Sequence, residues 1–288
     1  ESHGKALGVV IDGCPAGLEL CEDDIQVFLD RRKPGQSRYV TQRRESDSVE
    51  ILSGVFEGKT TGTPISLMVR NESQRSADSS EIAGYYRPGH ADYTFDEKYG
   101  FRDYRGGGRS SGRETIGRVA AGAVAVKLLG QMGIELYAYA SAIGGIAMDR
   151  DSFNLEERDN NPFAMPDAGA ALKIKKYADR KLEECNSMGG IIECVVKNMP
   201  AGIGEPVFDK LDANLAKAIM SIGAVKGVEI GDGFAAADST GLENNDAFRM
   251  KDGHIVKQTN HAGGILGGMS DGSDIILRAA VKPTPSIA

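Results

Sequence analysis

The sequence contains no tryptophan, only four cysteines and only four histidines, and these shortages exclude several classes of protein. The cysteines form no C-x-x-C pair and are too sparse for a secreted disulfide scaffold, so we expect buried cytosolic thiols. The histidines form no H-x-x-x-H pair, which argues against a zinc site, and we predict no bound metal. No apolar run reaches the roughly 18 residues that a membrane helix needs, so we expect no membrane partner.

An excess of positive charge is also missing. The net charge of −7 argues against general nucleic-acid binding, which depends on basic surface to displace counterions. The arginines are nevertheless clustered, because residues 31–44 hold six basic residues and no acid. Further arginines follow at Arg87, Arg102, Arg105, Arg109, Arg113 and Arg118. Clustered arginines in an acidic protein favour a small, multiply anionic ligand, and a solvated basic surface is the alternative.

Glycine, in contrast, is abundant, with 37 residues in the chain. Many of these glycines separate short apolar runs, which predict strands near residues 8–11, 65–69, 190–196 and 275–281. The first residue is Glu1 rather than Met, and no basic and apolar leader follows it. We expect the chain to be truncated at both ends.

Two parts of the chain share a pattern. After the strands near residues 8–11 and 190–196, the triplet Pro-Ala-Gly occurs at residues 15–17 and again at 200–202. An amphipathic helix is expected after each triplet. The expected buried face of the first is Ile25, Phe28 and Leu29, and that of the second is Phe208, Leu211, Leu215, Ala218 and Ile222.

A ladder of glycines repeats as well. Gly54, Gly58, Gly62 and Ile65 are matched at the same spacing by Gly264, Gly268, Gly272 and Ile275. The pattern predicts a single α+β domain over residues 1–288, with an internal pseudo-repeat of about 8–130 and 190–288. The alternative is that glycine-rich sequences align easily by chance.

Residues 104–114, with the sequence YRGGGRSSGRE, are the most informative stretch. Ser111 and Glu114 have the spacing of a capping box, which predicts the start of a long, mostly buried helix over about residues 113–129. A glycine-rich loop at a helix N-terminus binds anions, and we expect Arg109 and Arg113 to face the anion. A plain capping box with stray arginines is the alternative. An RGG-type RNA tether is disfavoured because the segment runs directly into a core helix.

Two histidines lie on short turns. Residues 87–92 read RPGHAD, where proline and glycine place Arg87 and His90 on a rigid turn. A histidine in such a place can supply a proton near neutral pH, although a structural role is the alternative. The turn at residues 2–4 exposes Ser2 and His3 in a similar way, with a weaker signal.

Seven motifs in this order resemble the chorismate synthase family across essentially the whole chain. They are residues 1–4 (ESHG), 31–38 (RRKPGQSR), 54–64 (GVFEGKTTGTP), 87–92, 104–114, 260–264 (NHAGG) and 282–284 (KPT). The resemblance implies a carbon–oxygen lyase of aromatic amino-acid biosynthesis, the shikimate pathway. Its reaction is the 1,4-anti elimination of phosphate from 5-enolpyruvylshikimate 3-phosphate to give chorismate.

The family requires reduced FMN, although the reaction has no net redox change. The flavin is thought to pass an electron transiently to the substrate and later to take a proton. NADPH is an indirect reductant, and with no extra reductase domain visible, an external flavin reductase is the expected partner. The resemblance also implies a cytoplasmic homotetramer with a β-α-β sandwich fold built from two similar halves.

The family's functional residues carry over by motif. Those that bind substrate correspond to Ser2, Arg32, Arg38, Arg87, Ser110 and Arg113, and Arg32 and Arg38 also match the family's NADP contacts. His90 corresponds to the residue that gives a proton to the departing phosphate, and His3 to the one that protonates or holds the reduced flavin. The flavin-binding residues correspond to Arg109, Ser110, Ser111, Gly223, Ala224, Gly267, Lys282, Pro283, Thr284, Pro285 and Ser286.

The sequence departs from the family pattern in two places. Gly223 stands where the family usually has asparagine, so one side-chain contact to the flavin is in doubt. The family's Arg-His-Asp-Pro segment, which supplies an arginine and an aspartate near flavin N5, is expected beyond Ala288. The other classes considered are a flavin-dependent oxidoreductase, which would consume NADPH stoichiometrically, and a nucleic-acid-binding protein, which the net charge disfavours.

Overall fold

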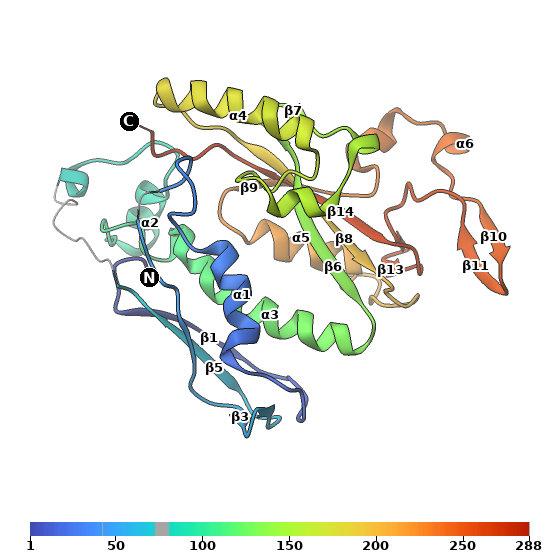
Figure 1. The fold of residues 1–288 in the computed structure, drawn as a ribbon, viewed down its shortest axis with the longest axis horizontal. Helices are drawn as coiled ribbons and strands as arrows, with labels where there is room; N and C mark the ends of the chain where they lie inside the picture. The colour runs from blue at the N-terminus through green and yellow to red at the C-terminus, as the bar shows by residue number, and fades with distance from the viewer. Residues whose placement is uncertain (42, 73–80, 288) are drawn as a thin grey trace. The chain divides into compact units, whose positions relative to one another are not determined.

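A computed structural model describes residues 1–41, 43–72 and 81–287 (Figure 1). The chain divides into two compact units, Glu1–Gln131 and Met132–Ala288, where the sequence led us to expect one domain with a pseudo-repeat. The first unit ends one residue beyond the expected boundary of the first half at residue 130. None of the described helices combines the length and the apolar character needed to cross a membrane.

The first unit is built on a three-stranded antiparallel sheet in the order β1-β5-β2, formed by β1 (Ala6–Ile11), β5 (Ile65–Arg70) and β2 (Val49–Ile51). A small hairpin of β3 (Val55–Phe56) and β4 (Lys59–Thr60) precedes β5. Two longer helices, α1 (Glu22–Arg32) and α3 (Thr115–Gln131), pack against each other, and α3 also packs on β1. The strands predicted near residues 8–11 and 65–69 are therefore confirmed.

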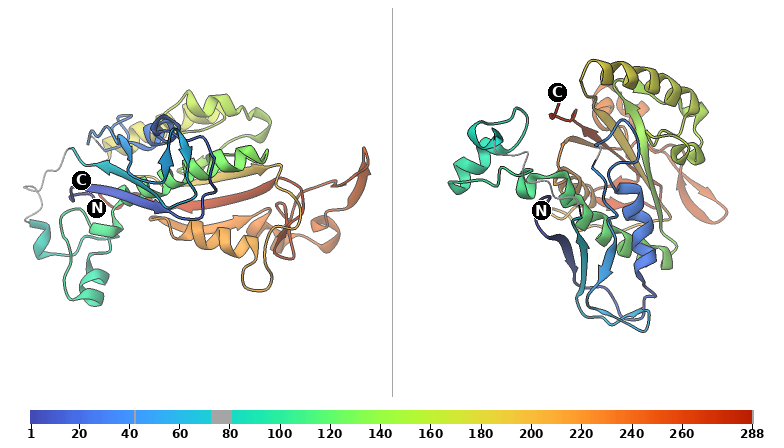
Figure 2. Two further views of the ribbon diagram at one scale, coloured as in Figure 1. Left: turned by 90° about the horizontal axis from the view of Figure 1, so that it is seen from below. Right: turned by 60° about the vertical axis from the view of Figure 1, so that its left-hand side comes forward.

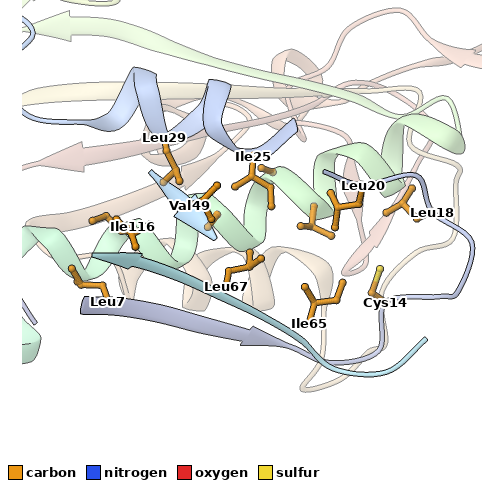
Figure 3. Packing of buried hydrophobic residues seen from close by; sticks show 14 residues of the cluster. Leu7, Cys14, Leu18, Leu20, Ile25, Leu29, Val49, Ile65, Leu67 and Ile116 are labelled. Atoms are coloured by element: carbon orange, nitrogen blue, oxygen red, sulfur yellow. The ribbon is translucent and has the colours of Figure 1, made fainter. Parts of the chain in front are cut away.

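The core of this unit lies between the sheet and the two helices (Figure 3). Alternate residues of the strands point into it, because successive side chains of a strand face opposite sides. Ile25 and Leu29 of α1 are completely buried and Phe28 packs against the core, which confirms the predicted face of the first helix. From α3 the buried residues are Ile116, Ala120, Ala123 and Val124.

Short elements connect β5 to α3 and carry two of the seven motifs described above, residues 87–92 and 104–114. They are the 3₁₀ turn Glu81–Gly84, helix α2 (Asp92–Tyr99), and the 3₁₀ turns Gly108–Ser110 and Gly112–Glu114. Helix α2 ends at Gly100, whose φ of 78° is a left-handed C-cap that glycine adopts without strain.

The second unit contains a five-stranded antiparallel sheet in the order β7-β6-β8-β14-β9. Its strands are β6 (Glu135–Ile143), β7 (Ile146–Ala147), β8 (Gly190–Lys197), β9 (Val225–Ile230) and β14 (Ile275–Val281). Helix α4 (Ala168–Glu183) packs on β7 and forms a second core with Ala140 and Met165. The predicted strands near 190–196 and 275–281 are confirmed.

The remaining elements of this unit include 3₁₀ turns at Arg150–Ser152, Leu155–Asp159 and Gly233–Asp238 and the short helix α6 (Gly241–Asn244). The hairpin of β10 (Phe248–Lys251) and β11 (His254–Lys257) projects away from the rest of the unit, as Figure 2 shows. A smaller hairpin is formed by β12 (Ile265–Leu266) and β13 (Met269–Ser270).

The second predicted helix differs from expectation. Helix α5 spans Leu211–Met220 and none of its residues is buried within the described part of the chain. Phe208 lies before the helix, in a loop closed by the bridge between Glu205 and Asp209, and its side chain is 91% exposed. The expected buried face is therefore wrong, because Phe208 and Ile222 lie outside the helix, Ala218 is exposed, and Leu211 and Leu215 are only partly buried.

The matched glycines of the two units have similar backbone conformations. Gly54, Gly58 and Gly62 have φ values of 81°, 75° and 82°, and Gly264, Gly268 and Gly272 have 82°, 82° and 90°. Thr60 Oγ1 donates to Pro15 O at 2.6 Å, and Ser270 Oγ donates to Pro200 O at 2.5 Å. Both sheets also place the last strand of the repeated pattern between the other two, as β1-β5-β2 and β8-β14-β9.

The cysteines correct one expectation. All four are free thiols, but only Cys14 is buried, whereas Cys21 and Cys185 are exposed. Cys21 is the residue before α1, and Cys185 follows α4 with a φ of 50°, so each lies at a helix end that faces solvent. Burial raises the pKa of the Cys194 thiol, which keeps it in the unreactive protonated form.

Candidate active site

The N-terminal turn lies against the glycine-rich loop. Ser2 is buried, and its Oγ is 3.0 Å from His3 Nδ1 and donates to Gly106 O at 3.4 Å. Gly106 has a φ of 85°, and a Cβ at this position would collide with the His3 ring and the Ser2 hydroxyl. Two motifs that are about a hundred residues apart in the sequence, residues 1–4 and 104–114, therefore form one structure.

Arg113 lies next to this turn and is buried, with only 6% of its surface exposed. Its Nη2 donates to Asp47 Oδ1 at 3.0 Å and to Asn71 Oδ1 at 2.8 Å, and its Nε donates to the same Asn71 oxygen at 3.0 Å. The third nitrogen, Nη1, is buried and has no partner among the described residues. A buried donor without a partner is costly, which makes this atom a candidate contact for an anionic ligand.

Arg32 meets Arg113 at the same carboxylate. Its Nη1 donates to Asp47 Oδ2 at 3.0 Å, and its other nitrogens donate to Thr115 Oγ1 and Gly112 O, both at 3.2 Å. Burial lowers the pKa of Arg32, and the like charge of Arg113 lowers it further, while Asp47 opposes both effects. Asp47 is fully buried and has a φ of 49°, so a short, strained loop holds one carboxylate between two guanidinium groups.

The expected capping box is only half present. Ser111 does cap the turn, because its Oγ accepts from Arg113 N at 3.3 Å. Glu114, however, pairs with Arg118 at 3.0 Å, one helical turn further on, instead of reaching back to Ser111. Arg113 was expected to face an anion, and its side chain is instead buried, with two of its nitrogens bonded to Asp47 and Asn71.

The turn at residues 87–92 is held by a second ion pair. Arg87 donates from its backbone N, Nε and Nη2 to the buried Asp92, at 3.0, 2.9 and 2.8 Å. His90 is partly buried, and its Nδ1 is 3.0 Å from Pro88 O. Because a carbonyl only accepts, this contact assigns a proton to Nδ1 and fixes the orientation of the ring.

The Arg87–Asp92 pair predicts a loss of stability in acid. The side-chain hydrogen bond from Arg87 lowers the pKa of Asp92 from 3.8 to about 2, against the opposing effect of burial. A depressed carboxyl pKa adds stability that is complete above about pH 5 and lost as the pH falls toward 2, roughly 2 kcal/mol in all. The free energy of unfolding, measured with urea, should therefore be higher for wild type than for Asp92→Asn at pH 6, and this difference should be smaller at pH 3. A difference that stays constant with pH would contradict this assignment.

A cavity of about 320 Å³ lies between α2 and the glycine-rich loop. Its walls combine the aromatic rings of Phe95, Tyr99 and Phe101 with the backbone of Gly107 and Gly108 and the side chain of Arg109. Arg109 is highly exposed, with 80% of its side chain accessible, and lies 3.2 Å from Glu1. Ser110 is exposed too, and its Oγ donates to Gly107 O at 2.6 Å.

Arg38 and Arg32 belong to the same motif, residues 31–38, but their side chains lie in different surroundings. Arg32 turns into the interior of the unit, whereas Arg38 is exposed and lies over the ring of Tyr39 at 5.1 Å. The structure brings Ser2, His3, Arg32 and Arg113 together through direct contacts and shared partners.

The predicted flavin residues of the second unit form two separate groups. Lys282 N donates to Ala224 O at 2.9 Å, so Gly223 and Ala224 lie beside the segment of residues 282–286. Ala224 has a φ of 72°, an uncommon value for a residue with a side chain. Gly267 lies in the turn of the β12–β13 hairpin, next to Gly268, which contacts Lys210 at the start of α5. Since Gly223 and Ala224 follow the end of α5, Gly267 lies at the opposite end of this helix.

The sequence reasoning missed four residues that organise the first unit's site. Asp47 and Asn71 hold Arg113, and Arg43 donates to Ser2 O at 3.0 Å while it pairs with the buried Glu45. Glu45 and Asp47 are the first acids after the basic run of residues 31–44. That position was a signal for ion pairs, whereas nothing in the sequence pointed to Asn71.

The mixed α+β architecture and its convergent arginines define an enzyme class with an anionic small-molecule substrate. Comparison with known proteins identifies the class. The model of the chorismate synthase family matches residues 1–288. The chorismate synthase of Lachnospira eligens is 71% identical over 288 residues, covering 100% of this chain and 79% of that protein, and the one of Agathobacter rectalis is 67% identical, covering 100% and 78%. A crystal structure of chorismate synthase matches with a TM-score of 0.84 at 34% identity, covering 98% of this chain and 82% of that chain.

The chain belongs to the chorismate synthase family. It is a carbon–oxygen lyase of the shikimate pathway that converts 5-enolpyruvylshikimate 3-phosphate to chorismate for aromatic amino-acid biosynthesis. Its fold is the mixed α+β fold of the solved chorismate synthase structure.

Proposed function

We propose that the reaction is a 1,4-anti elimination supported by reduced FMN, with the substrate's anionic groups bound at the arginines of the first unit. The observation that carries this proposal is the buried Nη1 of Arg113, a desolvated cationic donor without a partner among residues that the structure describes. The substrate has a phosphate and two carboxylates, and such groups form charge-assisted hydrogen bonds with guanidinium. Arg32, Arg38, Arg87, Ser2 and Ser110 complete the proposed substrate contacts.

His90 is the proposed donor of a proton to the departing phosphate. The contact of its Nδ1 with Pro88 O fixes the orientation of the ring on the turn that also carries Arg87. In its doubly protonated form the ring would give the proton on Nε2 to the phosphate as the C–O bond breaks, and the neutral Nδ1–H form would remain. Arg87, aligned by Asp92, would balance the negative charge that develops on the leaving group.

His3 is the proposed proton carrier on the flavin side of the site. Ser2 Oγ engages Nδ1 of the ring, which leaves Nε2 to hold or protonate the reduced cofactor. The close fit of Gly106 against this ring limits the positions that His3 can adopt. Such preorganisation reduces the entropy lost when the reacting groups are brought together.

The glycine-rich loop has features that suit reduced FMN. Gly106, Gly107 and Gly108 all have positive φ, so their backbone can approach a ligand closely without a Cβ in the way. In our proposal Arg109, Ser110 and Ser111 of the first unit hold the cofactor. A flavin contact is also proposed, separately, for Gly223, Ala224, Gly267 and residues 282–286 of the second unit. When bound, reduced FMN supplies electron density to the substrate, and the protein's own groups bind, orient and exclude water. Gly223 provides only backbone to this contact.

The proposal predicts that reductant is used catalytically. In an anaerobic assay with chemically reduced FMN and 5-enolpyruvylshikimate 3-phosphate, chorismate should form without NADPH and in many-fold excess over the flavin oxidised, since elimination has no net redox change. NADPH should act only by keeping FMN reduced, through Arg32 and Arg38 or through an external flavin reductase. Consumption of one NADPH for each product molecule would instead indicate an oxidoreductase.

We also propose that the enzyme acts in the cytoplasm as a homotetramer, as the family resemblance implies. Exposed apolar side chains of the second unit support assembly, because contiguous apolar surface favours association. They include Phe208, Phe234 and Leu242 at 83–91% exposure and Phe248, Met250 and Ile255 around the β10–β11 hairpin.

We further propose that the two units descend from one duplicated strand–helix–strand element. The equal order of the matched strands, the left-handed matched glycines and the paired Thr60 and Ser270 hydroxyl bonds support this proposal. Superposition of Pro15, Gly54, Gly58 and Gly62 on Pro200, Gly264, Gly268 and Gly272 tests it. Strands that then run in different directions would contradict a duplication.

A further inference from the structure

Asn71 lies directly after β5, at the point where the N-terminal turn and Arg113 meet. Its side-chain amide makes two hydrogen bonds through the nitrogen and two through the oxygen, which is nearly everything an amide can form. No motif of the sequence and no proposed contact to substrate or cofactor involves this residue.

The amide nitrogen fixes the turn that carries His3. Asn71 Nδ2 donates to Glu1 O at 2.9 Å and to Gly4 O at 2.7 Å, so it bridges the two ends of the turn. The backbone N of Asn71 adds a bond to Lys5 O at 3.1 Å. The turn thereby has a fixed position relative to the end of β5, and His3 has little freedom to move away from Gly106.

The amide oxygen fixes Arg113. Asn71 Oδ1 accepts from both Nε and Nη2, while Asp47 takes a second bond from Nη2. These contacts occupy one edge of the guanidinium group and leave Nη1 as the buried nitrogen without a partner among the described residues. The direction in which Nη1 points is therefore set by Asn71 and Asp47.

We infer that Asn71 is a positioning residue. Its side-chain amide fixes His3 and Arg113 relative to each other, so that the proposed proton carrier and the proposed anion-binding group keep a constant separation. The inference rests on the proposed roles of His3 and Arg113. The four bonds require an amide, since an aspartate would turn an acceptor toward two carbonyl oxygens and a leucine would remove all four hydrogen bonds.

The test uses Asn71→Leu, which keeps the approximate shape and removes all four bonds. Turnover at saturating substrate should fall at least about tenfold, because small misplacements of catalytic groups have effects of this size. Substrate Kd, measured by titration, should rise at least about tenfold as Arg113 loses its alignment. Hydrogen exchange of the N-terminal peptide should become at least about tenfold faster, which reports the turn independently of turnover.

Asn161→Leu is the matched control. Asn161 also makes four amide bonds, with Nδ2 donating to Glu157 O and Met165 O and Oδ1 accepting from Phe163 N and Met165 N, but none of its partners is a proposed site residue. Its loss should lower thermal stability and leave turnover and Kd within about threefold of wild type. If Asn71→Leu behaves like this control, Asn71 is merely structural and the inference is wrong.

Two further variants complete the test. Should Asn71→Leu fail to fold, Asn71→Asp keeps the acceptors for Arg113 and loses the donors, and it should still show slow turnover and fast N-terminal exchange. Normal values of both in the folded Asp variant would overturn the inference. His3→Ala separates the two proposals, because normal turnover there refutes the role of His3, whereas slow His3→Ala with normal Asn71→Leu refutes the role of Asn71.

Discussion

Replacement of His90 by alanine should lower turnover by roughly 10²–10⁴-fold, the usual loss when a general acid is removed. The structure supports this expectation, because the contact with Pro88 O fixes one ring nitrogen and orients the other. FMN affinity should change little, since His90 is not among the residues that we propose to hold the flavin. Anaerobic steady-state kinetics together with flavin titrations measure both quantities.

The control for this experiment is His254→Ala. His254 lies in β11, where its residue is exposed, and it has no proposed role. Turnover of this variant should equal that of wild type. Near-normal turnover of His90→Ala would show that His90 only shapes the turn, and a loss of thermal stability in the same variant would support that structural role.

Replacement of Arg113 by alanine should weaken substrate binding by roughly 10- to 150-fold, the equivalent of about 1.5–3 kcal/mol for a lost charge-assisted hydrogen bond. The sequence alone suggested no effect on stability, because a residue in the first turn of a helix that points at a ligand is not part of the core. The structure changes that expectation, since Arg113 is buried against Asp47. Breaking a buried ion pair from one side costs about 3–5 kcal/mol, so the variant should also melt at a lower temperature.

Two variants separate binding from stability. Arg113→Lys keeps the charge but loses the fork that serves Asn71 and Asp47 together, so it should recover only part of the affinity. Arg118→Ala removes an exposed arginine one helical turn away, paired with Glu114, and should change neither property. Normal substrate affinity in a destabilised Arg113→Ala protein would assign Arg113 to the fold alone.

The sequence was a good guide wherever local chemistry decided the structure. The four strands and the α1 face followed from apolar periodicity. Phe208 was misassigned because a bridge between Glu205 and Asp209 closes a loop before the helix can start, and tertiary contacts of this kind leave no trace in periodicity.

The sequence predicted the arginines of the site but not the residues that orient them. Arg32 and Arg113 were identified, but the direction of each guanidinium depends on Asp47 and Asn71, which are 24 residues apart in the sequence and reach the arginines only through folding. Asp47 follows the basic run of residues 31–44, which signals an ion pair but does not say which arginines share the carboxylate. Asn71 was concealed because an asparagine after a strand is ordinary turn chemistry.

The close fit around Gly106 allows the activity of related sequences to be predicted. The space that a methyl group would need at this position is already filled by His3 and Ser2. A chain with serine and histidine in the N-terminal turn therefore requires glycine at residue 106 of the loop. A chain that retains Ser-His-Gly near its start but has alanine at the position of Gly106 should have a displaced imidazole and little lyase activity. The combination of the Ser-His-Gly turn with glycine at this position can therefore distinguish active enzymes from inactive relatives by sequence alone.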